Sequence, residues 1–304
     1  MKIDKNASIE SKTPANGAQI EPAIGTTVPE AESEIISCYD KRYEDLTLAD
    51  DFMFKLIFED PVFCKRLIEI ILGLKITRLV SLETEKTLNE NYFSHSVRFD
   101  VYVEGKDEVI DIELQRVDTK ELPERARVYQ GSIDIETFRK GERYSDIKES
   151  YIIFFCLFDP FHFGLPVYTV EQIFKEARDK NYNDRTHKVF YNCPAFEKCA
   201  DAEIRAILKL LTGKTADSDF TKTVANEVKR KIENKYMRST FMGVKELIAE
   251  RKTEWFAEGI AEGIAEGERN NKIATAKNMC RMGFTTEQIA EATELPVEAV
   301  IALR

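Results

Sequence analysis

The sequence predicts an α/β fold with a helical C-terminal extension. Residues 97–115 alternate apolar and polar side chains in two runs around a turn at residues 105–108, which is typical of a β-hairpin. Residues 151–158 read YIIFFCLF, a continuous apolar run expected of a strand that is buried on both faces. From Ala202 onward the pattern is mostly helical.

Composition indicates a chain that can form a core and excludes a membrane span. The chain has 304 residues, of which 43% are hydrophobic, and no run approaches the roughly 18 consecutive apolar residues of a spanning helix. The net charge of −10 argues against broad coating of nucleic acid but allows a local basic groove. Residues 1–17 lack the apolar segment of a secretory signal, so we expect a cytoplasmic location.

The first part of the chain combines a tail with a helix. Residues 1–42 are rich in Ser, Thr, Pro, Ala, Glu and Gly, and this composition predicts a disordered tail. We expect order from about Leu46, with a helix over residues 51–58 that Thr47 or Asp50 caps.

Four further elements follow from local signals. A helix is expected from Pro61 to its end at Gly73, because Pro favours the first turn and Gly the C-terminus. Residues 76–85 are expected to form a strand, and residues 188–192 a short one. Another helix is expected over residues 123–140.

The hairpin carries acids that should repel each other. A symmetric turn places Asp100 opposite Glu113, with Asp111 two residues away, and Phe99 on the same face as Val101. Opposed carboxylates destabilise a sheet unless a cation lies between them. Mg²⁺, or Mn²⁺ in its place, fits such a site, because one or two carboxylates, waters and a substrate phosphate complete its shell. The alternative is a solvated hairpin face.

Three C-terminal features each allow two interpretations. The basic stretch 222–252 fits a solvated helix face or a surface that follows phosphates. The Ala-Glu-Gly repeats in residues 257–267 fit a small-residue stripe for a partner helix, which would make a homo-oligomer, or a flexible spacer. Residues 274–304 resemble a helix-turn-helix, for which DNA reading and dimerisation both remain open.

The cysteines and histidines do not form a familiar metal pattern. Six scattered cysteines are expected to be reduced thiols, and the spacing of His187, Cys193 and Cys199 matches no usual zinc site. The three histidines of the chain are not paired at ligand spacing, which disfavours a histidine-based metallohydrolase.

Taken in order, these motifs resemble the PD-(D/E)xK nuclease family transposases. Residues 51–58 resemble the family's opening Asp-x-x-Phe-Lys-x-x-Phe helix, and Asp100 matches its strand aspartate. The segment Glu113-Leu-Gln115 matches the Glu-x-Gln form of the acid-x-lysine motif. Arg125 and Tyr129, which share a helix face, fit the family's Arg-x-x-Tyr-Tyr segment, and the resemblance runs from about Leu46 to the C-terminus.

The resemblance implies a restriction-endonuclease-like core, a small mixed sheet flanked by helices, over residues 43–215, followed by a helical region over 216–304. It implies a Mg²⁺-dependent DNA endonuclease linked to recombination or mobile elements. In that chemistry Asp100 and Glu113 hold the metal, Asp51 completes the shell or holds a metal-bound water, and Asp111 is an additional candidate ligand.

One departure bears on activity. Gln115 stands where the wider superfamily has lysine, and a neutral amide cannot stabilise negative charge as an ammonium does. Arg125 or Lys55 could supply that charge at the substrate, while Arg125 and Tyr129 also fit a packing pair between helix and sheet. The alternative function is a catalytically weak or inactive nuclease fold that acts as a DNA-binding or protein-interaction module.

Overall fold

The computed structural model describes residues 39–76, 79–88 and 97–303 of the chain. Residues 1–38 of the expected tail therefore lie outside the described residues. The described residues divide into two compact units, one reaching to residue 252 and the other beginning at residue 253.

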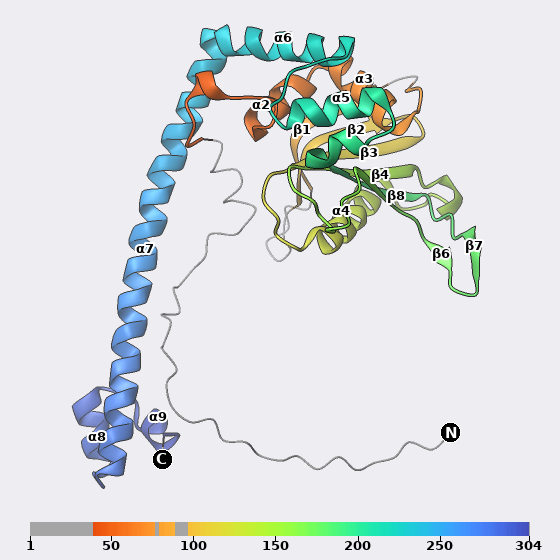
Figure 1. Cartoon of the computed structure of the whole chain (residues 1–304). Coiled ribbons are helices and arrows are strands. Elements are labelled where there is room, and N and C mark those ends of the chain that lie inside the picture. The colour runs from red at the N-terminus through yellow and green to blue at the C-terminus, as the bar shows by residue number, and fades with distance from the viewer. Residues whose placement is uncertain (1–38, 77–78, 89–96, 304) are drawn as a thin grey trace. The chain divides into compact units, whose positions relative to one another are not determined.

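A six-stranded mixed sheet forms the centre of the larger unit (Figure 1). Its strand order is β1-β2-β3-β4-β8-β5; β1 to β3 are antiparallel, β3, β4 and β8 are parallel, and β5 is antiparallel to β8. The strands are β1 Leu79–Leu88, β2 Val97–Gly105, β3 Glu108–Gln115, β4 Glu149–Cys156, β5 Val167–Val170 and β8 Thr186–Asn192. A separate two-stranded sheet pairs β6 Ile173–Phe174 with β7 Ala177–Asn181.

Helices cover both faces of the sheet and form the C-terminal region. The α-helices are α2 Asp51–Phe58, α3 Pro61–Leu72, α4 Leu122–Thr137, α5 Ala202–Leu211, α6 Asp219–Glu233, α7 Lys235–Arg281, α8 Thr286–Thr293 and α9 Val297–Ile301. Short 3₁₀ segments are η1 Tyr43–Asp45, η2 Tyr144–Asp146 and η3 Cys193–Lys198. This architecture confirms the predicted α/β class with a mixed sheet flanked by helices.

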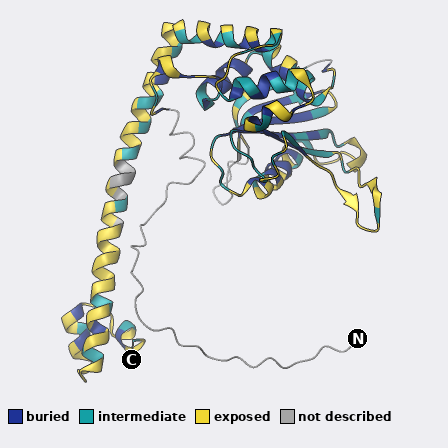
Figure 2. Cartoon of the chain, viewed as in Figure 1, coloured by how far each residue is buried: buried dark blue, intermediate teal, exposed yellow. Residues whose placement is uncertain are grey.

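The two faces of the sheet pack against different helices. One core contains Ile112 and Ile153 of the sheet together with apolar residues of α2, α3, α5 and α6. The opposite core contains Ile152 and Phe154 together with residues of α4, which connects β3 to the parallel strand β4. Because β3 and β4 are covered on both sides, their residues are mostly buried, as Figure 2 shows.

Two predicted helices near the site agree closely with the structure, while the strand predicted over residues 76–85 is observed as β1 over Leu79–Leu88. Helix α2 spans the predicted residues, and α3 ends at Gly73, whose φ of 65° is the left-handed conformation that favours glycine. Helix α4 ends at Thr137, before the predicted end at residue 140, because Phe138 takes an extended backbone and its ring stacks on Tyr144 at 5.3 Å. Strands β5 to β7 were not predicted.

The basic stretch 222–252 is part of the larger unit. Val224, Val228 and Phe241 are buried in the same core as α2, so the compact unit extends past residue 215, the expected domain limit. Several of its cations contact residues near the start of the described chain; the ion pairs are Lys231–Glu59, Arg238–Glu44 and Lys252–Asp40. These acids partly neutralise the basic stretch.

The C-terminal residues form a small helical core of their own. Ala276, Ile289 and Val300 are fully buried together, and Thr285 caps α8 in a capping box with Gln288. Helix α7 runs unbroken through the Ala-Glu-Gly repeats, so these residues are helical and not a flexible spacer. Among the described helices, none has the length and apolar character that crossing a membrane requires.

The residues considered for zinc include a buried thiol and a histidine that contacts a carboxylate. Cys193 is buried, and His187 Nε2 lies 2.7 Å from Glu149 Oε2. The described cysteines are all free thiols, as predicted.

Candidate active site

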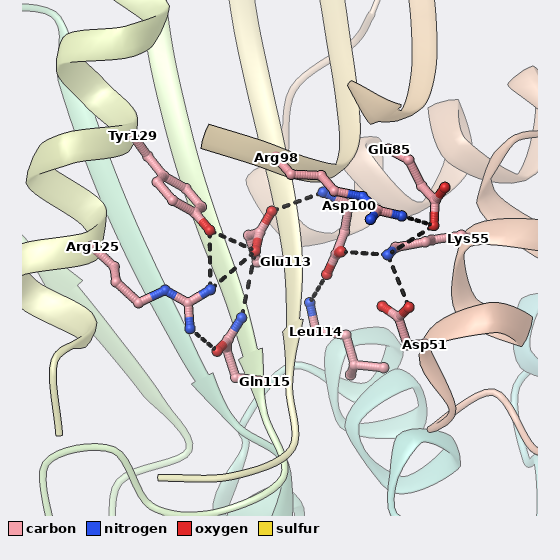
Figure 3. Close-up of polar contacts among 10 residues, drawn as sticks. All are labelled: Asp51, Lys55, Glu85, Arg98, Asp100, Glu113, Leu114, Gln115, Arg125 and Tyr129. Carbon is pink, nitrogen blue, oxygen red and sulfur yellow. Dashed lines mark hydrogen bonds and ion pairs between the residues drawn. The ribbon is translucent and has the colours of Figure 1, made fainter. Parts of the chain in front are cut away.

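The candidate site lies where β2 and β3 stop pairing. Their ladder runs from Glu104–Val109 to Val101–Ile112, which confirms the predicted register. At the next position the side chains take over the backbone hydrogen bonds: Asp100 N–H donates to Glu113 Oε1 at 2.8 Å, and Leu114 N–H donates to Asp100 Oδ2 at 3.0 Å (Figure 3). The two carboxylates therefore occupy the point where the strands separate.

The neighbouring strand β1 is irregular at the same position. Glu85, opposite Asp100, is missing from the β1–β2 ladder and has a φ of 60°. A left-handed backbone at a residue other than glycine costs about 1–3 kcal/mol and is typical of functional sites. The alternation of side chains breaks here, so Phe99 packs against Tyr129 on the α4 face, and the prediction that it shares the face of Val101 is wrong.

A lysine from α2 neutralises the Asp100 side of the site. Lys55 Nζ lies 2.9 Å from Asp100 Oδ1, 2.9 Å from Asp51 Oδ2 and 3.5 Å from Glu85 Oε1, and Glu85 also pairs with Arg98. Burial alone would lower the pKa of Lys55, but the surrounding carboxylates raise it above its ordinary value. Burial and repulsion by Asp100 raise the pKa of Asp51 to about 6, although Lys55 partly opposes this.

The Glu113 side of the site contacts α4. Glu113 Oε2 lies 3.4 Å from Gln115 Nε2, 3.5 Å from the Tyr129 hydroxyl and 3.8 Å from an Arg125 nitrogen. Arg125 also donates to Gln115 Oε1 at 2.6 Å and to the Tyr129 hydroxyl at 3.0 Å. Burial of Glu113 and repulsion by Asp100 raise the pKa of Glu113 to about 8.

The structure thus brings nearly all the predicted residues into one network, but not in the predicted orientation. Alternation alone placed the carboxylates of Asp100 and Glu113 on a single face of the hairpin. In the structure Asp100 binds Lys55 of α2 and Glu113 contacts Arg125 of α4, on opposite faces of the sheet. Each reaches the other strand's backbone because the ladder is open between them.

Asp111 lies closer to the hairpin turn than Asp100 and Glu113 do, and it pairs with Tyr102 in the β2–β3 ladder. Asp111 is fully buried, and neither of its carboxyl oxygens has a hydrogen-bond partner among the described residues. Burial raises its pKa well above the ordinary value, and repulsion by Glu113 and then Asp100 adds to this. An unpartnered buried carboxyl costs free energy unless a proton or a cation compensates it.

The donor set fits a hard divalent cation. Among the described residues, no cluster of three or more His, Cys, Asp or Glu side chains is arranged to hold a metal. Mg²⁺ does not require such a cluster, since one or two carboxylates, waters and substrate phosphate oxygens suffice. Asp100 and Glu113 supply the carboxylates, and both act electrostatically on the buried carboxyl of Asp111.

Sequence reasoning missed three charged residues near this network. Arg98 was visible on the polar side of the hairpin, but nothing in the sequence indicated the left-handed backbone of Glu85 or its contact with Lys55. Arg116, directly after Gln115, binds Asp50 Oδ1 at 2.5 Å.

The fold and the site together define a nuclease-like α/β protein, with a mixed sheet whose antiparallel hairpin presents an aspartate and a glutamate. The family model described as PD-(D/E)XK nuclease family transposase matches residues 48–254, which is more than half of the chain. The chain belongs to this family. It matches none of the curated proteins and none of the solved structures with which it was compared.

Proposed function

We propose that this protein is a metal-dependent DNA endonuclease that hydrolyses phosphodiester bonds with Mg²⁺ or Mn²⁺, in a process linked to mobile elements or recombination. The observation that carries the proposal is the pair Asp100 and Glu113 at the strand separation, with a cation from a different helix beside each carboxylate. Family membership supports a nuclease-like role.

Asp100 and Glu113 would hold the metal, and Asp111 is the candidate third ligand. When bound, the cation supplies polarisation of the scissile phosphate and lowers the pKa of a bound water. Lys55 neutralises Asp100 in the structure, and a cation held by Asp100 would leave the ammonium of Lys55 in contact with Asp51 and Glu85. The Lys55 ammonium would also stabilise the acidic site without a metal.

The positive charge that Gln115 lacks comes from the flanking helices. Gln115 accepts a hydrogen bond from Arg125 at 2.6 Å, and the Tyr129 hydroxyl accepts a second one at 3.0 Å, so the guanidinium is oriented from two sides. The Arg125 side chain is 20% exposed and can reach a phosphate at the edge of the site. Lys55 provides a second cation from α2.

Cleavage of supercoiled plasmid in Mg²⁺ or Mn²⁺ tests the proposal. Asp100→Asn should abolish nicking, because it removes a metal-binding charge while keeping an oxygen that accepts from Leu114 N–H. Asp107→Asn, in the exposed turn of the same hairpin, is the matched control and should cut like the parent. If Asp100→Asn cuts as well as the parent while both variants melt normally, the site assignment is wrong.

An inactive DNA-binding or protein-interaction module is the second candidate. The observation in its favour is that Glu113 is only 2% exposed, and this burial raises its pKa to about 8, which opposes the charged form that a metal ligand needs. The two candidates differ in metal binding without DNA. A functional metal site predicts that Mg²⁺ raises the melting temperature more at pH 9 than at pH 6, because Glu113 must lose its proton to bind the metal. Glu113→Gln should remove this increase. If Mg²⁺ does not raise the melting temperature at either pH and the protein does not cleave DNA, the result supports an inactive DNA-binding or protein-interaction module.

Three further expectations remain part of the proposal. DNA is the expected partner, and self-association through the C-terminal helices is checked by sedimentation of the full chain. The cytoplasmic location is checked by fractionation of cells.

A further inference from the structure

A pocket of about 520 Å³ opens beside the site network, at the carboxyl ends of two parallel strands. Leu157 follows β4 and Pro194 follows β8, and the end of α5 closes the pocket. Ligands in α/β sheets commonly bind outside the carboxyl ends of parallel strands. The lining residues are Lys41, Thr47, Ala49, Leu157, Pro194, Phe196, Leu211, Thr212, Gly213 and Lys214.

The wall of this pocket combines apolar and cationic groups. Leu157, Leu211 and the ring of Phe196 supply apolar surface, while Lys41 and Lys214 supply positive charge. None of the described lining residues is acidic. Lys214 Nζ lies 4.4 Å from the centre of the Phe196 ring, so a cation and an aromatic side chain stand side by side.

A carboxylate next to the pocket is already neutralised. Asp50 is fully buried, and its Oδ1 binds both Lys41 at 2.7 Å and Arg116 at 2.5 Å. Two cations for one carboxylate leave an excess of positive charge near the pocket. This excess favours an anionic ligand.

The pocket is connected to the candidate active site through two short backbone paths. Leu157 N–H donates to the carbonyl oxygen of Gln115 at 2.8 Å. Thr47 N–H donates to Asp50 Oδ2 at 2.9 Å, and Asp50 directly precedes Asp51 of the site. The segments that line the pocket are therefore direct neighbours of segments that carry the site.

We propose that this pocket binds a nucleotide, with the base against Leu157, Leu211 and Phe196 and the phosphate on Lys214 and Lys41. Apolar pockets with a few charged groups are typical small-molecule sites, and aromatic side chains with basic groups bind single-stranded nucleotides. The nucleotide is either an unpaired one in the DNA strand, which rests on the proposed function, or a free mononucleotide, which does not.

Calorimetric titration of the full chain in EDTA tests this proposal without relying on cleavage. The probes are dAMP, deoxyadenosine, inorganic phosphate and a 5′-phosphorylated trideoxyadenylate. Lys214→Met keeps the aliphatic stem and removes the charge, and Lys140→Met, at an exposed lysine outside the pocket and outside the basic stretch, is the matched control. Lys214→Met should weaken binding of the phosphorylated probes about tenfold, the usual scale for a hydrogen bond to a charged group.

The pattern across the probes identifies the source of the nucleotide. A free mononucleotide is supported if the affinity for dAMP exceeds the affinities for deoxyadenosine and phosphate and is lowered by Lys214→Met but not by the control variant. Binding of the trinucleotide alone, again lowered in Lys214→Met only, supports the DNA strand. Equal affinities of parent and Lys214→Met, equal losses in both variants, or no binding of any probe would overturn the proposal. Repeating the titration with Asp100→Asn separates it from the nuclease proposal, since the pocket should bind regardless of catalysis.

Discussion

Replacing Lys55 with methionine probes the charge balance of the site. The ammonium of Lys55 contacts three carboxylates, and its side chain is only 7% exposed. Methionine fills a similar volume but supplies no charge. Asp51 and Asp100, whose side chains are 14% and 13% exposed, would then face each other without a cation.

The size of the effect follows from this burial. Removing one partner of a buried ion pair costs about 3–5 kcal/mol, and we take the lower value because Glu85 is 47% exposed and solvent screens its contact. A unit of this size loses about 2–4 °C of melting temperature per kcal/mol, so Lys55→Met should melt about 6–12 °C below the parent in EDTA at pH 8.

The loss should depend on pH in a defined direction. The pKa of Asp51 is about 6 in the folded protein, above its ordinary value of 3.8, even with Lys55 beside it. A carboxyl whose pKa is higher in the folded than in the unfolded state lowers stability as pH rises through that interval. Without Lys55 the pKa of Asp51 rises further, so the difference between variant and parent should be small at pH 5 and larger at pH 8.

Thermal unfolding followed by circular dichroism checks both statements, with exposed Lys75→Met as the control. Addition of Mg²⁺ should restore part of the lost stability, because the metal replaces the missing cation between the carboxylates. Equal melting temperatures of parent and Lys55→Met at every pH would refute the charge network as described.

Two other predictions concern the motif and the C-terminal unit. Gln115→Lys restores the lysine of the wider superfamily, but it should lower the melting temperature and should not increase plasmid nicking. The reason is that Arg125 already lies 2.6 Å from the Gln115 oxygen and that the Gln115 side chain is only 1% exposed, so a second cation would be buried beside the first. Faster nicking by Gln115→Lys would contradict this prediction. Ile289→Ala should destabilise the C-terminal core by about 2–5 kcal/mol, because Ile289 is buried among residues of that core. Hydrogen exchange of the backbone amides of β3 and β4 should stay unchanged. Faster exchange in both strands would show that the two units do not unfold separately.

Local patterns carried much of the information about the hairpin. The register of β2 and β3 follows from period-two alternation, because a slip by one residue would expose the apolar face. The ends of α3 followed equally from Pro61 and Gly73, whose backbone preferences are intrinsic. The motif order also indicated the family, which the match to residues 48–254 confirms.

The sequence by itself thus determined the pairing of β2 with β3 and the helices near the hairpin, because these depend on spacing along the chain. Only the tertiary structure decided that Asp100 binds Lys55 of α2 while Glu113 contacts Arg125 of α4. It also decided that Glu85 takes a left-handed backbone and that a cationic pocket forms beside β4 and β8. These features depend on how distant segments pack, and electrostatic contacts between such segments leave no periodic signal in the sequence.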